Sequence, residues 1–463
     1  MLFNSHVFLF VFLPLVLLLW YRRALPLSWR LAMLTLASYL FYAWWDWRFV
    51  SLMLVSTLVD FLAGQRIHAA TESSARRGWL VVSLAANLGL LAFFKYAGFF
   101  SHSLSELVQL FGAPGFEHIP EIILPIGISF YTFQSMSYSI DIYRRDAKPT
   151  RDFLRFAAYV SMFPQLVAGP IVRYSEIEQQ LDEVEPPPSP LQAAVGARLF
   201  VLGLAKKLLI ADVVARRVDP LLADTAALDL VTGWLAMLGY TTQIYFDFSG
   251  YSDMAVGLGL LLGFRFPQNF NSPYKSADIS QFWRRWHMSL SFWLRDYLYI
   301  SMGGGRRGRG RTLRNLVITM FLGGLWHGAA WTFVVWGLYH GLLLVLNILW
   351  RQRGVQMPKF AAIALTFLSV VVGWVFFRAA TFADAGAIFS AMLGLGGAGL
   401  AGIAEHAVSI ALVCGALGIS LLAPNTWEIP WRPRRLEAAL VGMILLLCIL
   451  RLSSPSPFLY FQF

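Results

Sequence analysis

The chain has 463 residues, of which 57% are hydrophobic and 14% are charged, and its mean hydropathy is strongly positive. This composition excludes a soluble globular enzyme and predicts an all-α polytopic integral membrane protein. The net charge of +11 requires no nucleic-acid partner, because basic residues on cytoplasmic loops orient membrane proteins. The two cysteines, Cys414 and Cys448, lie in apolar segments and indicate neither disulfides nor a thiolate metal site.

Apolar runs along the chain predict the spanning helices. A span needs about 20 residues, and we expect about 11 spans, with broken or re-entrant helices between them, in one transmembrane domain over residues 1–463. Within it, residues 1–145 form N-terminal helices, 150–350 the core that carries the chemistry, and 358–463 C-terminal helices. The runs cover approximately residues 8–20, 31–45, 50–62, 79–100, 122–140, 191–213, 234–264, 317–325, 331–350, 360–377, 388–403, 410–422 and 440–450.

The first run and the basic residues indicate the orientation. Residues 8–20 have no basic segment before them and no small-residue cleavage site after them, which favours a helix over a signal peptide. Lys and Arg are missing between residues 97 and 143, whereas clusters follow the first, third and fifth runs. Because positive charge is retained in the cytoplasm, we expect the N-terminus outside and these clusters inside. The clusters are Arg22, Arg23, Arg30, Arg66, Arg76, Arg77, Arg144, Arg145, Lys148 and Arg151.

Two segments depart from the pattern of a simple span. Residues 163–170, Phe-Pro-Gln-Leu-Val-Ala-Gly-Pro, are apolar, but their prolines and glycine interrupt a helix and predict a broken or re-entrant segment buried in protein. Residues 234–264 are long enough to span, yet they include Gln243, Asp247 and Asp253. Polar groups in such number are expected to face a cavity or one another.

Residues 281–296 combine aromatic and charged side chains: Gln-Phe-Trp-Arg-Arg-Trp-His-Met-Ser-Leu-Ser-Phe-Trp-Leu-Arg-Asp. The tryptophans alone are equally typical of a belt at the membrane interface. A charged side chain at mid-bilayer costs roughly 3 kcal/mol or more unless it is paired or faces a cavity. Because Arg284, Arg285 and His287 lie among the tryptophans, a helix that lines a polar vestibule is favoured. Asp278 is expected to cap its start.

Histidines further along give a second candidate. His327 lies in Gly-Gly-Leu-Trp-His-Gly, residues 323–328. A neutral histidine at a helix contact is the simpler interpretation, but the glycines allow a substrate to come close. His340 has no such context and is expected to be a packing residue. We predict no metal, because the sequence contains neither a His-x3-His pair nor a thiolate cluster.

The loop of residues 303–311, Gly-Gly-Gly-Arg-Arg-Gly-Arg-Gly-Arg, is strongly basic. A cytoplasmic anchor that obeys the positive-inside rule is the favoured interpretation. The alternative is contact with a donor phosphate or an anionic lipid, although the loop lacks the Lys-Ser/Thr ending of a nucleotide P-loop. The residues concerned are Arg306, Arg307, Arg309 and Arg311.

These motifs together resemble the membrane-bound O-acyltransferase (MBOAT) superfamily. The resemblance rests on residues 283–297, on Leu-Trp-His-Gly at 325–328, on Phe-Asp-Phe-Ser-Gly-Tyr at 246–251 and on the broken segment 163–170. The first ten residues and the last seven extend it to the branch of bacterial alginate O-acetyltransferase membrane subunits. The resemblance implies a ring of helices around a funnel open to the outside, with His327 at the base of a narrow passage and His287 as the second family position.

The funnel is expected to be lined by polar and aromatic side chains. The lining residues that we predict are Asp247, Asp253, Asn269, Asn271, Trp283, Arg285, Trp286 and Trp326.

The resemblance also implies an activity. We expect an acetyltransferase of the bacterial inner membrane that takes acetyl from a cytoplasmic thioester, acetyl-CoA, as a donor substrate without a bound cofactor. His327 would act as general base or form a transient acetyl-imidazole, and His287 or a nearby Asn or Trp N–H would stabilise the oxyanion. The expected partners are membrane lipids, a periplasmic acyltransferase and a polysaccharide secretion complex, with an alginate-like exopolysaccharide as final acceptor.

Other functions remain open at this point. The acceptor could be cellulose or another envelope polymer, and transfer to the polymer could be direct. A transporter also needs a polar cavity and broken helices, but it predicts inverted halves with matching breaks, and the breaks near Pro164 and Gly323 lack symmetric partners. A non-catalytic scaffold is excluded only by loss of activity when His327 is changed in a folded protein.

Overall fold

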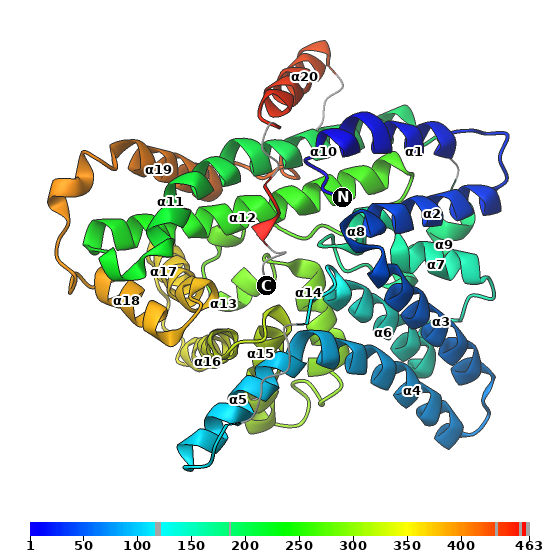
Figure 1. Cartoon of the computed structure of the whole chain (residues 1–463), viewed down its shortest axis with the longest axis horizontal. Coiled ribbons are helices and arrows are strands. Elements are labelled where there is room, and N and C mark those ends of the chain that lie inside the picture. Colours follow the sequence, from blue (N-terminus) through cyan, green and yellow to red (C-terminus); the bar gives the residue numbers. More distant parts are fainter. Residues whose placement is uncertain (116–121, 185–186, 431–433, 453–455, 460–463) are drawn as a thin grey trace. The chain divides into compact units, whose positions relative to one another are not determined.

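The computed structural model describes residues 1–115, 122–184, 187–430, 434–452 and 456–459. These residues form helices, turns and loops, with no strand among them. They belong to two compact units, one of Met1–Ala197 with Ala255–Pro267, the other of Arg198–Met254 with Gln268–Phe463. Two continuous helices, α10 and α12, contribute to both units (Figure 1).

The first unit is built from the N-terminal helices. Its helices are a π-helical turn at Phe8–Phe12, α1 (Leu13–Trp20), α2 (Leu27–Asp46), α3 (Arg48–Ala69), α4 (Ser73–Leu91), α5 (Ala97–Leu110), α6 (Ile128–Arg144), α7 (Phe153–Ser161), α8 (Phe163–Leu166), α9 (Tyr174–Glu183) and the first half of α10 (Pro190–Ala205). The helix α8 has only four residues, with Pro164 in its first turn, and it is completely buried. The prolines and glycine of residues 163–170 therefore prevent a long helix here, as the sequence predicts.

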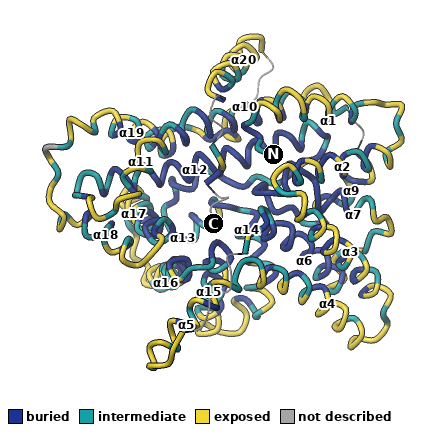
Figure 2. The backbone as a smooth tube through the Cα atoms, in the orientation of Figure 1, coloured by how far each residue is buried: buried dark blue, intermediate teal, exposed yellow. Residues whose placement is uncertain are grey.

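The second unit carries the central and C-terminal helices. They are most of α12 (Leu230–Leu261), α11 (Asp212–Ala223), α13 (Ile279–Trp283), α14 (Met288–Trp293), α15 (Arg309–His327), α16 (Trp331–Gln352), α17 (Lys359–Arg378), α18 (Phe382–Met392), α19 (Ala407–Leu422) and α20 (Arg435–Leu450). π-Helical turns at Lys206–Ala211 and Leu294–Tyr299 extend α10 and α14. Figure 2 shows that α12 is buried over most of its length, in spite of its polar residues.

Four helical segments in the described part of the chain are long and apolar enough to cross a membrane: Arg48–Ala69, Ser73–Leu110, Trp331–Gln352 and Lys359–Arg378. Other helices, such as α1 and α19, are apolar but shorter. The membrane character of the chain is therefore clear, whereas the number of about 11 spans stays a prediction.

One expected span is wrong. The apolar run at 388–403 does not form a single helix, because α18 ends at Met392. Gly394 and Gly397 follow with φ angles of 79° and 102°, in the left-handed region that terminates helices. Apolar content alone predicts a span here, and the positive φ angles of the glycines override it.

In the second unit, α15 and α16 pack against each other more extensively than any other pair of described helices. Glycines allow their backbones to approach. A Cβ atom at Gly324 would collide with the carbonyl of Phe333, and one at Gly337 with the carbonyl of Met320. A Cβ atom at Gly341, one turn further along α16, would come within 3.1 Å of the Val317 Cα. Such small residues four apart let helix backbones approach in membranes. The pairing fixes the end of α15, where His327 lies.

Candidate active site

His287 lies in a turn that Asn269 holds in place. The Asn269 side-chain oxygen accepts hydrogen bonds from the backbone N–H and the hydroxyl of Ser289, at 3.2 and 2.9 Å, and lies 3.2 Å from Nδ1 of His287. Its amide nitrogen donates to Ser252 of α12 at 3.1 Å. Because the oxygen accepts from a backbone N–H, it is an acceptor toward His287 as well. Nδ1 of His287 therefore carries the proton, and Nε2 is an acceptor in the neutral ring.

The backbone of His287 is unusual. Its φ is 44° and its ψ is 56°, the left-handed conformation, and its side chain is completely buried. A non-glycine residue in this region costs of order 1–3 kcal/mol. The hydrogen bond from Met288 N–H to the Asn269 carbonyl, at 2.9 Å, holds the turn beside it. The strained conformation is maintained by the surrounding hydrogen bonds, as is common at functional sites.

His287 and His327 both contact Trp326. The ring of Trp326 lies 6.1 Å from that of His287 and 5.0 Å from that of His327, centroid to centroid. His327 is the last residue of α15, is 5% exposed, and also packs against Trp336 at 5.0 Å and Phe377 at 5.3 Å. The sequence motifs that carry the two histidines therefore meet in one place.

His327 lines a cavity of about 350 Å³ formed within the second unit. Its walls are the row Leu316, Thr319, Met320, Gly323 and His327 of α15, the row Trp336, Leu344, Ile348 and Arg351 of α16, and Ser280, Trp283, Arg284, Leu290, Ser291, Leu294, Arg295 and Tyr299. From Leu316 to His327 the cavity follows α15 over about 16 Å, at 1.5 Å per residue. Its lining changes from exposed arginine to a buried aromatic end.

Buried N–H groups point to a polar role for this aromatic end. Among the described residues, the indole nitrogens of Trp283 and Trp336 are buried and have no hydrogen-bond partner. Both residues line the cavity with His327. Buried indole N–H groups usually find an acceptor, so these two are candidates to donate to a bound group.

Arg285 and Trp286, the remaining predicted residues of segment 281–296, are not among the described residues that line the cavity. Trp286 is buried between Phe282 and Trp374, with ring centroids 5.7 and 4.9 Å away. Arg285 is half-buried, and its carbonyl accepts from the Asn271 N–H at 2.9 Å. Asp278 accepts from Gln281 N–H at 2.8 Å and caps α13, which confirms the predicted cap.

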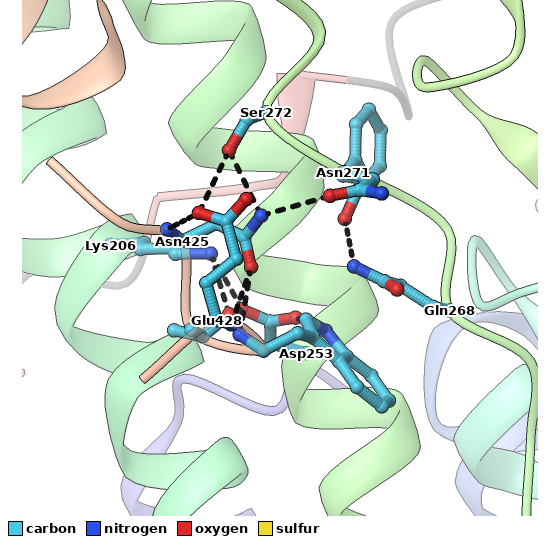
Figure 3. A network of polar contacts seen from close by, with 10 residues as sticks. Lys206, Asp253, Gln268, Asn271, Ser272, Asn425 and Glu428 are labelled. Carbon is cyan, nitrogen blue, oxygen red and sulfur yellow. Dashed lines mark hydrogen bonds and ion pairs between the residues drawn. The ribbon is translucent and has the colours of Figure 1, made fainter. Parts of the chain in front are cut away.

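Asp253 lies in a separate network of polar contacts, drawn in Figure 3. Its carboxylate accepts from Lys206 Nζ and Thr426 Oγ1, both at 2.6 Å, and from the Trp427 indole at 3.0 Å. In the same network Asn425 donates to the Asn271 side chain at 3.2 Å. Asp253 is thus paired, and together with Lys206 it joins α10 and α12 to the segment that precedes α20.

Asp247 has a similar environment one and a half turns away on α12. It pairs with Lys207, which also bonds to Asp212 at 3.0 Å. Its other oxygen accepts from Leu459 N–H at 2.9 Å, near the C-terminus. Neither Asp247 nor Asp253 is among the residues that line the cavity with His327 in the described part of the chain. Both contacts tie distant segments together.

The basic loop and His327 lie at opposite ends of one helix. Arg306, Arg307, Arg309 and Arg311 are exposed, and α15 begins at Arg309 and ends at His327. This separation along the axis is about 27 Å at 1.5 Å per residue. The length of α15 therefore separates the loop from His327, and none of the four arginines is among the described residues that line the cavity.

Sequence reasoning missed several cavity residues. Trp336 lies in the apolar run 331–350, which the sequence predicts as an ordinary span, and Tyr299 and Arg351 lie outside every motif. The spacing of Trp336, Leu344 and Ile348 places them on one helix face. That spacing was a usable signal, but a uniformly apolar helix gives no indication of which face borders a cavity.

Comparison with known proteins identifies the family. Residues 144–383 match the model of the membrane-bound O-acyltransferase family. The chain is 46% identical over 402 residues to the "Probable alginate O-acetylase AlgI" of Azotobacter vinelandii, covering 86% of this chain and 79% of the relative. The protein of the same name from Pseudomonas putida is 41% identical over the full length of both chains. A "Peptidoglycan O-acetyltransferase" from Helicobacter pylori is 37% identical, covering 88% of this chain and 82% of the relative.

The matched region contains α15 and α16 with the cavity between them, and it includes both His287 and His327. The apolar helices of the chain agree with a membrane-bound family. On these grounds the chain belongs to the membrane-bound O-acyltransferase family, and it is an acyltransferase.

Proposed function

We propose that the protein is an O-acetyltransferase of the bacterial inner membrane that passes acetyl from a cytoplasmic thioester to an exported polysaccharide. The names of relatives that cover most of the chain, alginate O-acetylase and peptidoglycan O-acetyltransferase, support acetylation of a polymer outside the cell. An alginate-like exopolysaccharide is the favoured acceptor. A periplasmic acyltransferase partner within the secretion complex would carry the acetyl group on to the polymer.

The observation that carries the proposal is the position of His327. It is a buried imidazole in the wall of an elongated cavity, near indole N–H groups that have no partner among the described residues. An imidazole can remove a proton from an acceptor hydroxyl, and such catalysis typically contributes about 10²–10⁴ in rate. The apolar walls exclude water, which would otherwise hydrolyse the activated acetyl group.

In the general-base mechanism, His327 takes the proton of the acceptor hydroxyl while the oxygen attacks the thioester carbonyl. The C–S bond then breaks, and the imidazolium returns the proton to the departing thiolate. In the covalent alternative, the imidazole attacks the carbonyl first, and the acceptor oxygen displaces it from acetyl-imidazole. Both mechanisms pass through an oxyanion, which a positioned hydrogen-bond donor must stabilise.

Trp336 is the better oxyanion donor than His287. The ring of Trp336 contacts His327 at 5.0 Å, the residue lines the cavity, and its buried N–H has no hydrogen-bond partner among the described residues. His287 uses its Nδ1 proton toward Asn269, so the neutral ring offers only an acceptor on the other side. We therefore assign His287 to positioning the turn beside Trp326, and the oxyanion to Trp336.

The donor would enter along the arginine-lined part of the cavity. Arg284, Arg295 and Arg351 are exposed there, and guanidinium groups suit the phosphates of acetyl-CoA. Arg351 ends α16 on the side where α15 begins, so it lies toward the basic loop. With that loop in the cytoplasm the donor enters from the cytoplasmic face, and the N-terminus is periplasmic. The loop arginines serve as the cytoplasmic anchor and contact lipid headgroups.

Inside-out membrane vesicles from cells that make the full chain test the proposal. Acetyl-CoA labelled in its acetyl group is added outside, where the cytoplasmic face is exposed. We expect ester-linked label inside the vesicles, with loss of that label for His327→Ala at equal protein abundance. Label that appears equally with His327→Ala, or not at all with the wild-type chain, would contradict the proposed reaction.

The same vesicles separate the alternatives. A scaffold predicts that polymer export depends on the protein while labelled acetate does not. Identification of the labelled polymer decides between an alginate-like acceptor and cellulose or another envelope polymer.

A further inference from the structure

His340 is a second imidazole close to the cavity, and its polar atoms are unused. Its side chain is completely buried in α16. Among the described residues, neither ring nitrogen has a hydrogen-bond partner. A neutral imidazole has one donor and one acceptor, and buried polar groups are nearly always bonded. If His340 only filled space, an apolar residue of similar size would fill the same volume without burying two unsatisfied nitrogen atoms.

His340 contacts aromatic rings on one side and the backbone of α17 on the other. Trp336 lies 4.9 Å and Trp283 5.1 Å from its ring, both close to perpendicular. Phe282 stacks on it at 6.3 Å. Behind it, a Cβ atom on Gly373 of α17 would come within 2.7 Å of Nε2. His340 therefore cannot move away from the two tryptophans.

The position of His340 along α16 places it on the cavity face. Trp336, Leu344 and Ile348 line the cavity, and His340 lies one turn after Trp336 and one turn before Leu344. Side chains four apart share a helix face. Trp283, which also lines the cavity, contacts His340 and covers it. His340 itself is not among the described residues that line the cavity, so a ligand would reach its imidazole only when the Trp283 side chain turns aside.

We propose that His340 and the Trp283 indole form a hydrogen-bonding subsite for an amide in the arm of the thioester donor. This rests on the proposed function. One helical turn, roughly 6 Å, separates His340 from Trp336, which contacts His327. In acetyl-CoA the amide nearest the sulfur follows it after two methylene groups. With the acetyl group at His327, this amide lies at the level of His340, where the imidazole accepts from its N–H and the indole donates to its carbonyl.

The alternative is a packing histidine. Contacts of a ring N–H with the faces of Trp283 and Trp336 would weakly satisfy the donor. They would leave the acceptor nitrogen unsatisfied, so replacement by phenylalanine would preserve or improve stability and leave catalysis unchanged. The two interpretations therefore predict opposite kinetic results for one substitution.

The test compares two donors in inside-out vesicles that contain the full chain. S-acetyl-N-acetylcysteamine carries an amide two methylenes from sulfur, and S-pentyl thioacetate has no amide. We expect His340→Phe to lower kcat/KM about tenfold for the first donor, mostly through KM, and to leave the second unchanged. His340→Gln, which retains a donor and an acceptor, should recover part of the loss. Tyr339→Phe, next in the chain and bonded to the Ser369 carbonyl instead, is the matched control.

Equal kinetics of His340→Phe and wild type with the amide donor would overturn the subsite, and so would an equal loss with both donors. If His340→Phe does not fold, Trp283→Phe gives the same comparison, because it removes the other partner of the amide and retains an aromatic ring. A wild-type chain without any acetyl transfer would instead overturn the proposed function. The two failures are therefore distinguishable.

Discussion

The side-chain oxygen of Asn269 lies 3.2 Å from Nδ1 of His287 and also accepts from the Ser289 backbone and hydroxyl. This single oxygen fixes both the tautomer of His287 and the left-handed turn at that residue. Because the Asn269 amide donates to Ser252, the turn is attached to α12 as well. The geometry beside Trp326 therefore depends on one buried amide.

Changing Asn269 tests this role. Asn269→Ala leaves buried donors unsatisfied, and we expect it to lower the free energy of unfolding by about 1–3 kcal/mol and acetyl transfer by at least tenfold. Asn269→Asp retains the acceptor, and its second oxygen can accept from the Ser252 hydroxyl, so it should keep the turn at the cost of a buried charge. Thermal unfolding in detergent and label transfer in vesicles measure the two effects. Wild-type behaviour of Asn269→Ala would show that the turn is held by other contacts.

Close packing of α15 on α16 should be necessary for activity. A methyl group at Gly337 collides with the carbonyl of Met320, and overpacking of this kind typically costs about 1–3 kcal/mol. We expect Gly337→Ala to displace His327 from Trp336 and to reduce acetyl transfer more than protein abundance. Gly418→Ala in α19 is the matched control, because nothing lies within 4 Å of its added Cβ. Similar activity of the two variants would contradict the requirement.

Substitution of Asp253 tests whether this residue forms a structural ion pair or lines the funnel. Removing one partner of a buried pair leaves an uncompensated charge and typically costs about 3–5 kcal/mol. We therefore expect Asp253→Asn and Lys206→Met each to destabilise the protein, and the double variant to lose less than the sum of the two. Thermal unfolding of all four proteins gives the coupling. Intact stability of Asp253→Asn with lost acetyl transfer would instead restore Asp253 to the funnel lining.

Arg351 and the basic loop should differ in their effect on the donor. We expect Arg351→Gln to raise KM for acetyl-CoA about fivefold, and increasing salt to reduce the difference from wild type. Replacing the four loop arginines by Gln should leave KM within about twofold, since none of them, unlike Arg351, is among the described residues that line the cavity. Initial rates at varied acetyl-CoA measure both. A larger rise in KM for the loop variant would assign donor phosphate binding to the loop.

The sequence predicted the features that follow from local chemistry. Apolar content identified the membrane class, the prolines at 163–170 predicted the interrupted helix, and Asp278 predicted a helix cap. Sequence motifs also single out His287 and His327, and the structure shows that both rings contact Trp326.

Long-range pairing could not be predicted in the same way. Asp253 meets Lys206 and Thr426, and Asp247 meets Lys207 and Leu459, across separations of 40 to 212 residues. A buried carboxylate in an apolar helix shows the same pattern in sequence whether it faces a cavity or a lysine. Which face of α16 borders the cavity was likewise undetermined, because both faces are apolar.

Ester-linked acetate on the exported polysaccharide tests the central claim most directly. Wild type, His327→Ala and His287→Ala are compared at equal membrane abundance, with polymer yield recorded for each. We predict that His327→Ala abolishes polymer acetate while protein and polymer remain, and that His287→Ala lowers it. Unchanged acetate in folded His327→Ala would remove this histidine from the mechanism and contradict the account.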